Sequence, residues 1–391
     1  MGQRRTASVV LPTPRSAWTD GTVYGLGDPL DDALILNRPL SDWRGAPALG
    51  EPGTEVRGPV FVWGADVWAS PGMLAGLEAA GADRPTPVRL VRAADGPGAT
   101  ADPLGRLPRR DGKILFDLWY VPQGCTVSLG DGVPAALEEA EPVDVETKVH
   151  EMDVAADSVS SGSGTDTMKL KFGSVAAAPV AHWVELQRAN LLALGTQALE
   201  RGPVVGVAAL VWAVMKAVSL NPFRVAAKVT SKGRKCLIHP SAVVEACVLG
   251  DEVKVDAGAI LRGCVLGNGV KVGPHAFGEF SILGDHAELQ KKAICTVSVV
   301  YPGARVGGTT QLSVIGRDAR FKLGAYTTDM NPGGSPVRVM TPGGLMPVDF
   351  GYLGSCIGHG AFVGSGIWIA PGRAIEAGRM ILRDASQMVM K

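Results

Sequence analysis

Residues 357–380 read IGHGAF VGSGIW IAPGRA IEAGRM, four units of six residues in one register, each beginning with an isoleucine or a valine. In such a repeat each six-residue unit forms one short strand and one bend. Three units therefore close one triangular coil, with the aliphatic residue pointing inward. Glycine at the bends tolerates a positive φ, and each coil pairs with its neighbours along the stack. The pattern predicts a left-handed parallel β-helix.

The same repeat extends upstream with a wider spacing. The segments that begin at Leu249, Leu266 and Leu283 share the pattern aliphatic-Gly-x-x-x-x-aliphatic and are 17 residues apart. Further coils are predicted near Val300 and at Ile315. We therefore predict a β-helix over residues 236–391, interrupted by a loop at Val337–Asp349.

Strand and helix patterns alternate in the first half of the chain. Buried strands are predicted from Val60, from Val88 and over Lys113–Val121. A helix is predicted over Ser70–Gly81, because Ser70 is a good N-cap and proline follows it. A second helix is expected over His182–Leu199. The alternation favours an α/β domain over residues 1–200.

The region between the two domains, residues 201–235, is expected to be a linking helix and a basic connector. Pro203–Leu220 is apolar apart from Lys216, at the lower edge of the length that spans a membrane. A helix buried on all sides is the favoured interpretation, and membrane contact through 203–220 is the alternative. The N-terminus lacks the apolar core of a signal peptide, which predicts a cytoplasmic protein.

Charge is unevenly distributed although the net charge is zero. Residues 1–150 carry 14 basic and 20 acidic side chains, whereas residues 232–391 carry 17 basic and 12 acidic ones. A mildly basic β-helix suits a phosphate-bearing ligand, but it falls short of the basic stripe of a nucleic-acid-binding protein. The six cysteines form no CxxC motif, which argues against a cysteine-rich zinc site.

Two C-terminal segments carry a resemblance to a known family. The stretch Leu323–Asn331 is similar to a Gly-Ala-Gly-Thr-x-x-x-Asn motif, and Phe362–Pro371 is similar to a Phe-x-Gly-Ser-x-x-x-x-x-Pro motif. Together with the domain order they resemble the bifunctional sugar-1-phosphate nucleotidylyltransferase/acetyltransferase family, whose familiar member is the bacterial N-acetylglucosamine-1-phosphate uridylyltransferase.

The resemblance implies a homotrimer that uses acetyl-coenzyme A or another acyl-coenzyme A as donor. It implies that Asn331 and Ser365 line the site of coenzyme A and sugar, and Tyr326, within the same motif as Asn331, is a further candidate for binding there. Lys322 and Arg338 are candidate phosphate contacts on chemical grounds.

Acyl transfer to an amine needs a base, commonly histidine. The family places a histidine about one coil before the Gly-Ala-Gly-Thr motif, but Val306–Ile315 here contains none. His359 is the nearest histidine in sequence to Ser365 and is therefore the candidate base.

The resemblance of the N-terminal half rests on shorter segments. Phe61–Asp66 resembles the strand that ends in the family's metal- or nucleotide-proximal aspartate, so Asp66 would hold Mg²⁺ if this domain is active. Leu36–Arg44 resembles a Thr-Arg-Pro segment, which makes Arg38 a nucleotide-proximal candidate. The family's phosphate-binding Gly-x-Gly-Thr-Arg start is absent, since the chain has Gly25-Leu-Gly27-Asp-Pro. We therefore expect a degenerate domain that has lost nucleotidyl transfer.

Three functions remain open. The first is an acyl-coenzyme A-dependent acyltransferase acting on a sugar phosphate or nucleotide sugar. The second is a non-catalytic binding or assembly protein of the same fold. The third, a γ-class carbonic anhydrase with three zinc-binding histidines, is disfavoured because the His-x4-His pair of that class is absent.

Overall fold

The computed structural model describes residues 6–11, 21–45, 48–93, 101–130, 132–155, 167–197, 230–349 and 351–384. The chain forms two compact units, one built mainly from residues up to Thr196 and one mainly from residues after it. The apolar segment 203–220 lies outside the described residues. No helix in the described ranges is long and apolar enough to cross a membrane.

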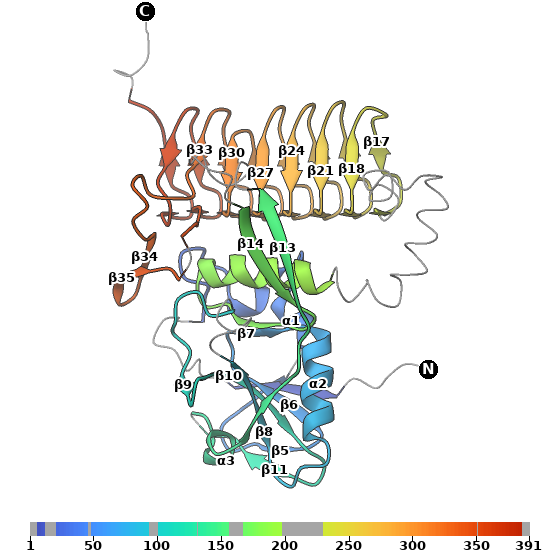
Figure 1. Ribbon diagram of the computed structural model, residues 1–391, viewed down its shortest axis with the longest axis vertical. Helices are drawn as coiled ribbons and strands as arrows, with labels where there is room; N and C mark the ends of the chain where they lie inside the picture. Colours follow the sequence, from blue (N-terminus) through green and yellow to red (C-terminus); the bar gives the residue numbers. More distant parts are fainter. Residues whose placement is uncertain are drawn as a thin grey trace, which may run out of the picture. The chain divides into compact units, whose positions relative to one another are not determined.

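The N-terminal unit is built on a seven-stranded mixed sheet (Figure 1). Parallel pairs join β1 to β4, β1 to β6 and β8 to β12, while β10 runs antiparallel to β6 and β8. The strands follow the spatial order β12 (Glu141–Asp144), β8 (Val88–Ala93), β10 (Lys113–Val121), β6 (Val60–Trp63), β1 (Ala7–Val10) and β4 (Ala48–Leu49), with β9 (Arg109–Arg110) on β10.

Smaller elements complete this unit. Two-stranded pairs are formed by β2 (Leu34–Ile35) with β3 (Arg38–Pro39), β5 (Glu55–Arg57) with β11 (Thr126–Ser128), β7 (Val67–Ala69) with β15 (Ala177–Pro179), and β13 (Val149–Ala155) with β14 (Thr167–Gly173). The helices are η1 (Leu30–Asp32), α1 (Leu40–Trp43), α2 (Pro71–Gly81), α3 (Ala135–Glu138) and one over residues 183–197.

Helix α2 begins and ends where its capping residues predict. Ser70 has extended backbone angles and its side chain accepts a hydrogen bond from the Met73 amide at 3.3 Å. Pro71 occupies the first helical position, where its missing N–H has no partner to lose. This helix and the seven-stranded sheet together confirm the α/β class predicted for this half of the chain.

The C-terminal unit is a parallel β-helix of three sheets, as the hexapeptide pattern predicts (Figure 1). The first sheet contains β16 (Ser231–Lys232), β19 (Val248–Leu249), β22 (Val265–Leu266), β25 (Ile282–Leu283), β28 (Val299–Val300), β31 (Val314–Ile315), β36 (Cys356–Ile357) and β39 (Ala374–Ile375). The second contains β17 (Leu237–Ile238), β20 (Lys254–Val255), β23 (Lys271–Val272), β26 (Glu288–Leu289), β29 (Arg305–Val306), β32 (Arg320–Phe321), β37 (Phe362–Val363) and β40 (Met380–Ile381). The third contains β18 (Val243–Glu245), β21 (Ile260–Arg262), β24 (Phe277–Glu279), β27 (Ile294–Thr296), β30 (Thr309–Gln311), β33 (Tyr326–Thr327) and β38 (Trp368–Ile369).

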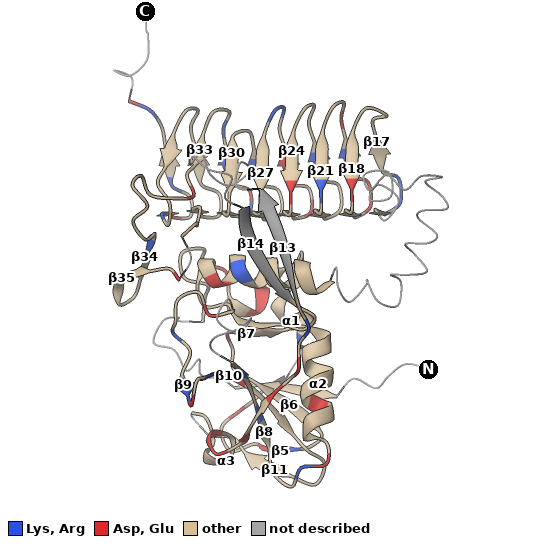
Figure 2. Ribbon diagram, viewed as in Figure 1, with Lys and Arg blue, Asp and Glu red and all other residues tan. Residues whose placement is uncertain are grey.

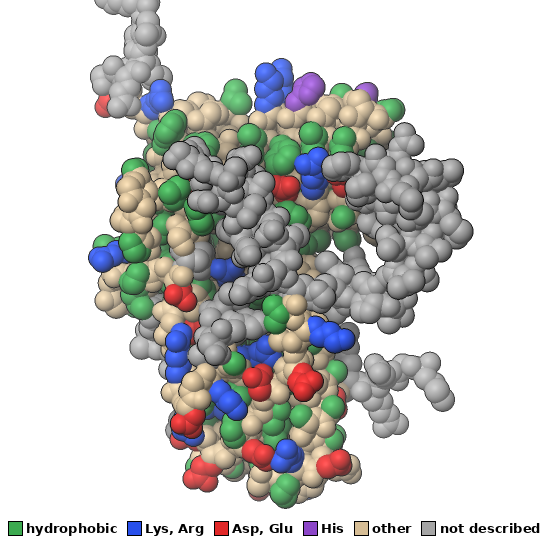
Figure 3. All heavy atoms as spheres, in the orientation of Figure 1, with side chains coloured by type: hydrophobic (Ala, Val, Ile, Leu, Met, Phe, Trp, Pro, Cys, Tyr) green, Lys and Arg blue, Asp and Glu red, His purple; other side chains and the backbone are tan. Residues whose placement is uncertain are grey.

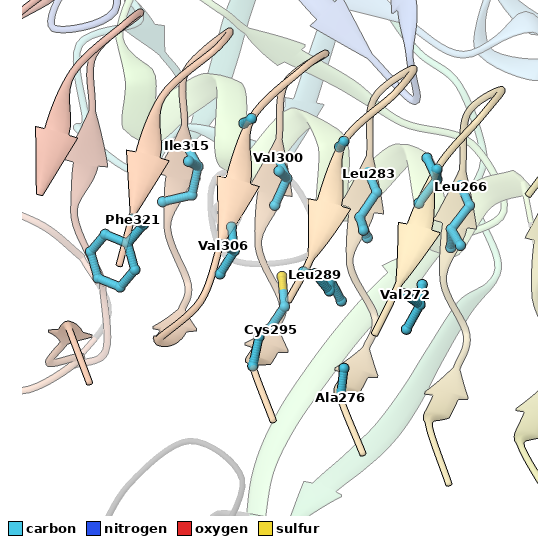
Figure 4. Packing of buried hydrophobic residues seen from close by; sticks show 14 of the residues in the cluster. Leu266, Val272, Ala276, Leu283, Leu289, Cys295, Val300, Val306, Ile315 and Phe321 are labelled. Atoms are coloured by element: carbon cyan, nitrogen blue, oxygen red, sulfur yellow. The ribbon is translucent and has the colours of Figure 1, made fainter. Parts of the chain in front are cut away.

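Buried aliphatic side chains fill the interior of the coils. Leu266, Leu283, Val300 and Ile315 come from successive strands of the first sheet and point inward at equivalent positions (Figure 4). Phe321 is fully buried in the same cluster. Because the same position recurs in every coil, each side chain packs on its counterparts above and below.

Positive φ angles occur at the coil corners, but not only at glycine. His275, His286 and Phe280 have φ of 56°, 58° and 45°, although glycine is the residue that tolerates such angles most easily. Each of these side chains lies over the corner glycine of the preceding coil. A Cβ on Gly258, for example, would lie 2.5 Å from Nδ1 of His275. The corner position of the preceding coil must therefore be glycine, because a Cβ there would clash with the larger side chain.

A hydroxyl–thiol ladder runs along one corner of the β-helix. Its members recur once per coil, and each accepts a backbone N–H from the next coil: Thr230, Cys247, Cys264, Ser281, Ser298 and Ser313, the last from the Ser355 amide. The Ser298 amide, for example, donates to Ser281 Oγ at 3.1 Å. The ladder satisfies corner amides that would otherwise be buried without a partner.

The interruption of the repeat is an excursion between β33 and β36. Residues 330–349 and 351–352 leave the β-helix and contain the antiparallel pair β34 (Arg338–Thr341) and β35 (Gly344–Pro347). The Leu353 amide donates to the Asp329 carbonyl oxygen at 2.7 Å, so the two ends of the excursion meet at Asp329.

Candidate functional site

The last coils place an aromatic pair on the outer face of the third sheet. Tyr326 on β33 is paired in register with Trp368 on β38, and their ring centroids are 5.7 Å apart. Trp368 is 74% exposed, which is unusual for a tryptophan in a folded coil. The Tyr326 hydroxyl donates to Gln311 Oε1 at 3.0 Å. One face of the tryptophan ring is thus available to a planar ligand.

An open hollow of about 480 Å³ lies beside this pair. It is lined by Gly366, Ile367, Trp368 and Arg383. The Arg383 guanidinium is held there because its Nη2 and Nε donate to the Gly366 carbonyl oxygen at 2.8 and 3.2 Å. A Cβ on Gly366 would lie 2.7 Å from Nη2 of Arg383. Glycine at 366 is therefore what allows a cation to sit against the hollow.

Asp329 lies three residues after Tyr326 and was not among the candidates from the sequence. It is 4% exposed, and its Oδ2 atom has no hydrogen-bond partner within the part of the chain that the structure describes. Burial raises its pKa to about 6. A buried carboxyl without a partner is costly and marks a candidate site residue. The signal in the sequence was a lone acidic residue at the point where the repeat breaks.

The residues predicted from the motifs fall in three places. Lys322 and Ser365 lie in adjacent coils at the corner between the second and third sheets, since the Lys322 amide donates to Val363. Ser365 is exposed, and the Lys322 ammonium lies 5.7 Å from the Phe362 ring centroid. Ser365 is thus next to the hollow-lining Gly366 in the chain, and Lys322 lies on the adjacent coil.

Asn331 and Arg338 belong to the excursion. The Asn331 side-chain amide donates to the carbonyl oxygens of Ser335 and Pro336 at 3.2 and 3.1 Å, so its N–H groups close a turn. Its side-chain oxygen is the group that remains for a ligand. Arg338 is exposed, and its carbonyl oxygen accepts from Arg373 Nη2 at 2.7 Å.

His359, the candidate base, lies at the corner between the first and second sheets. Its Nδ1 accepts a hydrogen bond from the Arg317 amide at 2.7 Å, and its ring lies 5.5 Å from that of Tyr301. This corner is not the one that carries Ser365. The structure therefore does not bring His359 and Ser365 together.

Asp66 lies in the turn between β6 and β7 rather than at the end of one long strand. Its Oδ2 is 2.6 Å from Arg106 Nη2, and both side chains are 6% exposed. Arg106 also pairs with Glu185, which is fully buried. Burial acts to lower the pKa of Arg106, but the charges of Glu185 and Asp66 outweigh it and the pKa rises. The carboxylate expected to hold Mg²⁺ is thus engaged by an arginine.

Glu185, the third member of the network with Asp66 and Arg106, is far from both in the sequence, so residue spacing does not predict the network. It is the third residue of the helix over 183–197, and its Oε2 accepts the His182 amide at 3.2 Å, as in a capping box. Arg38, the other nucleotide-proximal candidate, lies 4.9 Å above the Trp43 ring and donates to the Asp42 carbonyl oxygen. Within the described ranges no three His, Cys, Asp or Glu side chains gather as a metal site.

Acidic and basic side chains are interspersed on the β-helix. Glu245, Arg262 and Glu279 alternate along β18, β21 and β24 (Figure 2), and Arg262 pairs with Glu245 at 3.1 Å. Hydrophobic side chains lie between charged ones on the face shown in Figure 3.

The sequence matches no protein-family profile and no curated protein. Among solved structures, the chain is similar to LpxA, a UDP-N-acetylglucosamine acyltransferase from Bacteroides fragilis 9343, at 18% sequence identity and a TM-score of 0.19. The likeness covers 38% of this chain and 50% of that one. The chain thus matches half of the length of LpxA.

Proposed function

We propose that this chain is an acyltransferase that moves an acyl group from a coenzyme A thioester to a sugar phosphate or nucleotide sugar. The observation that carries the proposal is the exposed Trp368 beside a hollow that holds Arg383, on the last coils of a hexapeptide β-helix. An aromatic face with a cation next to it suits a nucleotide portion such as that of coenzyme A.

The parts of the site have separate tasks in this proposal. Trp368 stacks on the adenine ring, and the N–H groups of Arg383 that are not bound to Gly366 contact a phosphate. Gly364 and Gly366 flank Ser365, so the pantetheine arm approaches the backbone closely there. Asn331, Lys322 and Arg338 contact the acceptor or its phosphate from the excursion and the adjacent corner.

Ser365→Trp is expected to abolish the binding of acetyl-coenzyme A without unfolding the β-helix. Ser365 is exposed, so the larger side chain blocks the approach to the hollow but enters no core. In a thermal-shift assay, a ligand at 100 times its Kd adds about 2.7 kcal/mol to the stability of the wild type. The variant should lose that shift while its own Tm stays close to that of the wild type.

Ser231→Trp is the matched control, because Ser231 is an exposed serine on β16, in the first coil of the same β-helix. It should keep the acetyl-coenzyme A shift. Equal shifts in the wild type and Ser365→Trp would show that the site lies elsewhere. If none of the three proteins responds, the alternative of a non-catalytic protein of this fold replaces the proposal.

We further propose that the chain is a homotrimer that shares the site between β-helices. The support is one in-register row of apolar residues on the third sheet, in which Val243 and Ile294 are each 38% exposed and Phe277 is half-buried. Light scattering at micromolar concentration should give three times the chain mass of 40.6 kDa. A monomeric mass would exclude a shared site.

Nucleotidyl transfer is proposed to be lost from the N-terminal unit. The support is the pairing of Asp66 with Arg106, which occupies the carboxylate that Mg²⁺ would need.

A further inference from the structure

One corner of the last coils has a buried acidic group, and its burial is costly. Asp329 directly follows β33 and Thr328, at the corner where the excursion leaves the β-helix. Its carboxyl group is buried, and its Oδ2 has no partner among the described residues. Hydrogen bonds satisfy most buried carboxyl groups, so an unpartnered one is a candidate for contact with a ligand.

Resting on the proposed function, we propose that Asp329 is the proton acceptor of the acyl transfer. The two ends of the excursion meet at the hydrogen bond between the Leu353 amide and the Asp329 carbonyl oxygen. In this proposal the acceptor sugar approaches at that junction, on the side of Tyr326.

The step balances with an amine or a hydroxyl as the acceptor. The lone pair of the acceptor nitrogen or oxygen bonds to the carbonyl carbon of the acyl-coenzyme A thioester, while its proton passes to Oδ2 of Asp329. The C–S bond then breaks. The leaving thiolate takes the proton from Asp329 and departs as the thiol of coenzyme A, which restores the carboxylate.

The surroundings of Asp329 suit this task. The titratable group that faces it is the Tyr326 phenol on β33, whose pKa is raised by burial and then by the charge of Asp329. Among the described residues no lysine, arginine or histidine forms an ion pair with Asp329, so burial outweighs the backbone hydrogen bond that lowers its pKa. A pKa of about 6 leaves the carboxylate mostly ionised at neutral pH yet basic enough to take a proton.

His359 is the alternative base, and the geometry separates the two. Its Nδ1 is already the acceptor for the Arg317 amide, at a corner away from the excursion root. If His359 were the base, acyl transfer would therefore continue in a variant that lacks the Asp329 carboxylate.

The test compares Asp329→Asn with Asp349→Asn, a matched change at an exposed carboxylate of the same excursion. Turnover is followed by mass spectrometry with acetyl-coenzyme A and two acceptors, glucosamine 1-phosphate for an amine and UDP-N-acetylglucosamine for a hydroxyl. Asp329→Asn should lose at least about 100-fold in kcat, with an unchanged KM for acetyl-coenzyme A. Asp349→Asn should keep the wild-type rate.

A pH profile distinguishes catalysis from a structural role. The wild-type kcat should fall as the pH drops through about 6, and the residual rate of Asp329→Asn should lack this acid limb. The variant should also be folded and more heat-stable than the wild type above this pH. The raised pKa contributes stability that is fully present below the unfolded pKa and is lost as pH rises through the folded pKa.

Two failures can be told apart. If Asp329→Asn keeps more than a tenth of the rate and the same acid limb, the role of Asp329 is wrong and the acyltransferase stands. If the wild type neither binds acetyl-coenzyme A nor acylates either acceptor, the proposed function fails, and this role fails with it.

Discussion

Arg106→Met is expected to lower the free energy of unfolding of the N-terminal unit by about 3 to 5 kcal/mol. The substitution keeps the aliphatic bulk but leaves the carboxylates of Asp66 and Glu185 buried and without their cation. Burial already raises the pKa of Glu185, and the charge of Arg106 opposes that rise. Chemical denaturation followed by tryptophan fluorescence measures the loss, because Trp63, Trp68, Trp119 and Trp183 are all buried in this unit.

Arg109→Met is the control for this change. Arg109 lies 3.8 Å from Asp102, but its side chain is 49% exposed, so its loss should cost less than about 1 kcal/mol. Similar losses for the two variants would mean that Arg106 contributes no more than a surface charge.

Phe321→Ala is expected to destabilise the β-helix by about 3 to 5 kcal/mol. Phe321 is fully buried and packs against its neighbours in the interior of the β-helix. Truncation of its side chain therefore leaves a cavity between the coils. Thermal unfolding followed by the β-sheet circular dichroism signal should show a lower Tm.

Phe362→Ala provides the comparison within the same sheet. Phe362 on β37 pairs in register with the outward Arg320 and is only partly buried. Its truncation should lower Tm far less than that of Phe321. A larger effect at Phe362 would contradict the inward and outward assignment of the second sheet.

The β-helix was predictable because its signal is local and repeated. The inward positions of Leu266 and Leu283 follow from a spacing of 17 residues alone, and stacking enforces the same geometry in every coil. The corner residues were predictable only in part. His275 and Phe280 adopt a positive φ because the neighbouring coils hold the corner, which overrides the preference of the residue itself.

The site was less accessible to sequence reasoning. Tyr326 and Ser365 were recognised through short motifs, but their tie to Trp368 and Arg383 depends on pairing between coils across the excursion. Asp329 carries no motif, and what marks it is burial, which spacing does not reveal. The pairing of Arg106 with Asp66 joins residues 40 positions apart and could not be predicted without the fold.

Because of the hydroxyl–thiol ladder, the number of coils can change without a change in the structure of the remaining coils. Each step needs only a small hydroxyl or thiol once per coil, so a block of 17 residues between Cys247 and Ser298 could be removed or duplicated with every step intact. The strand spacing sets the change in length at about 4.8 Å per coil. The distance between the first coil and the coils that carry Trp368 can therefore change in steps of one coil. The geometry of the candidate site around Trp368 stays the same.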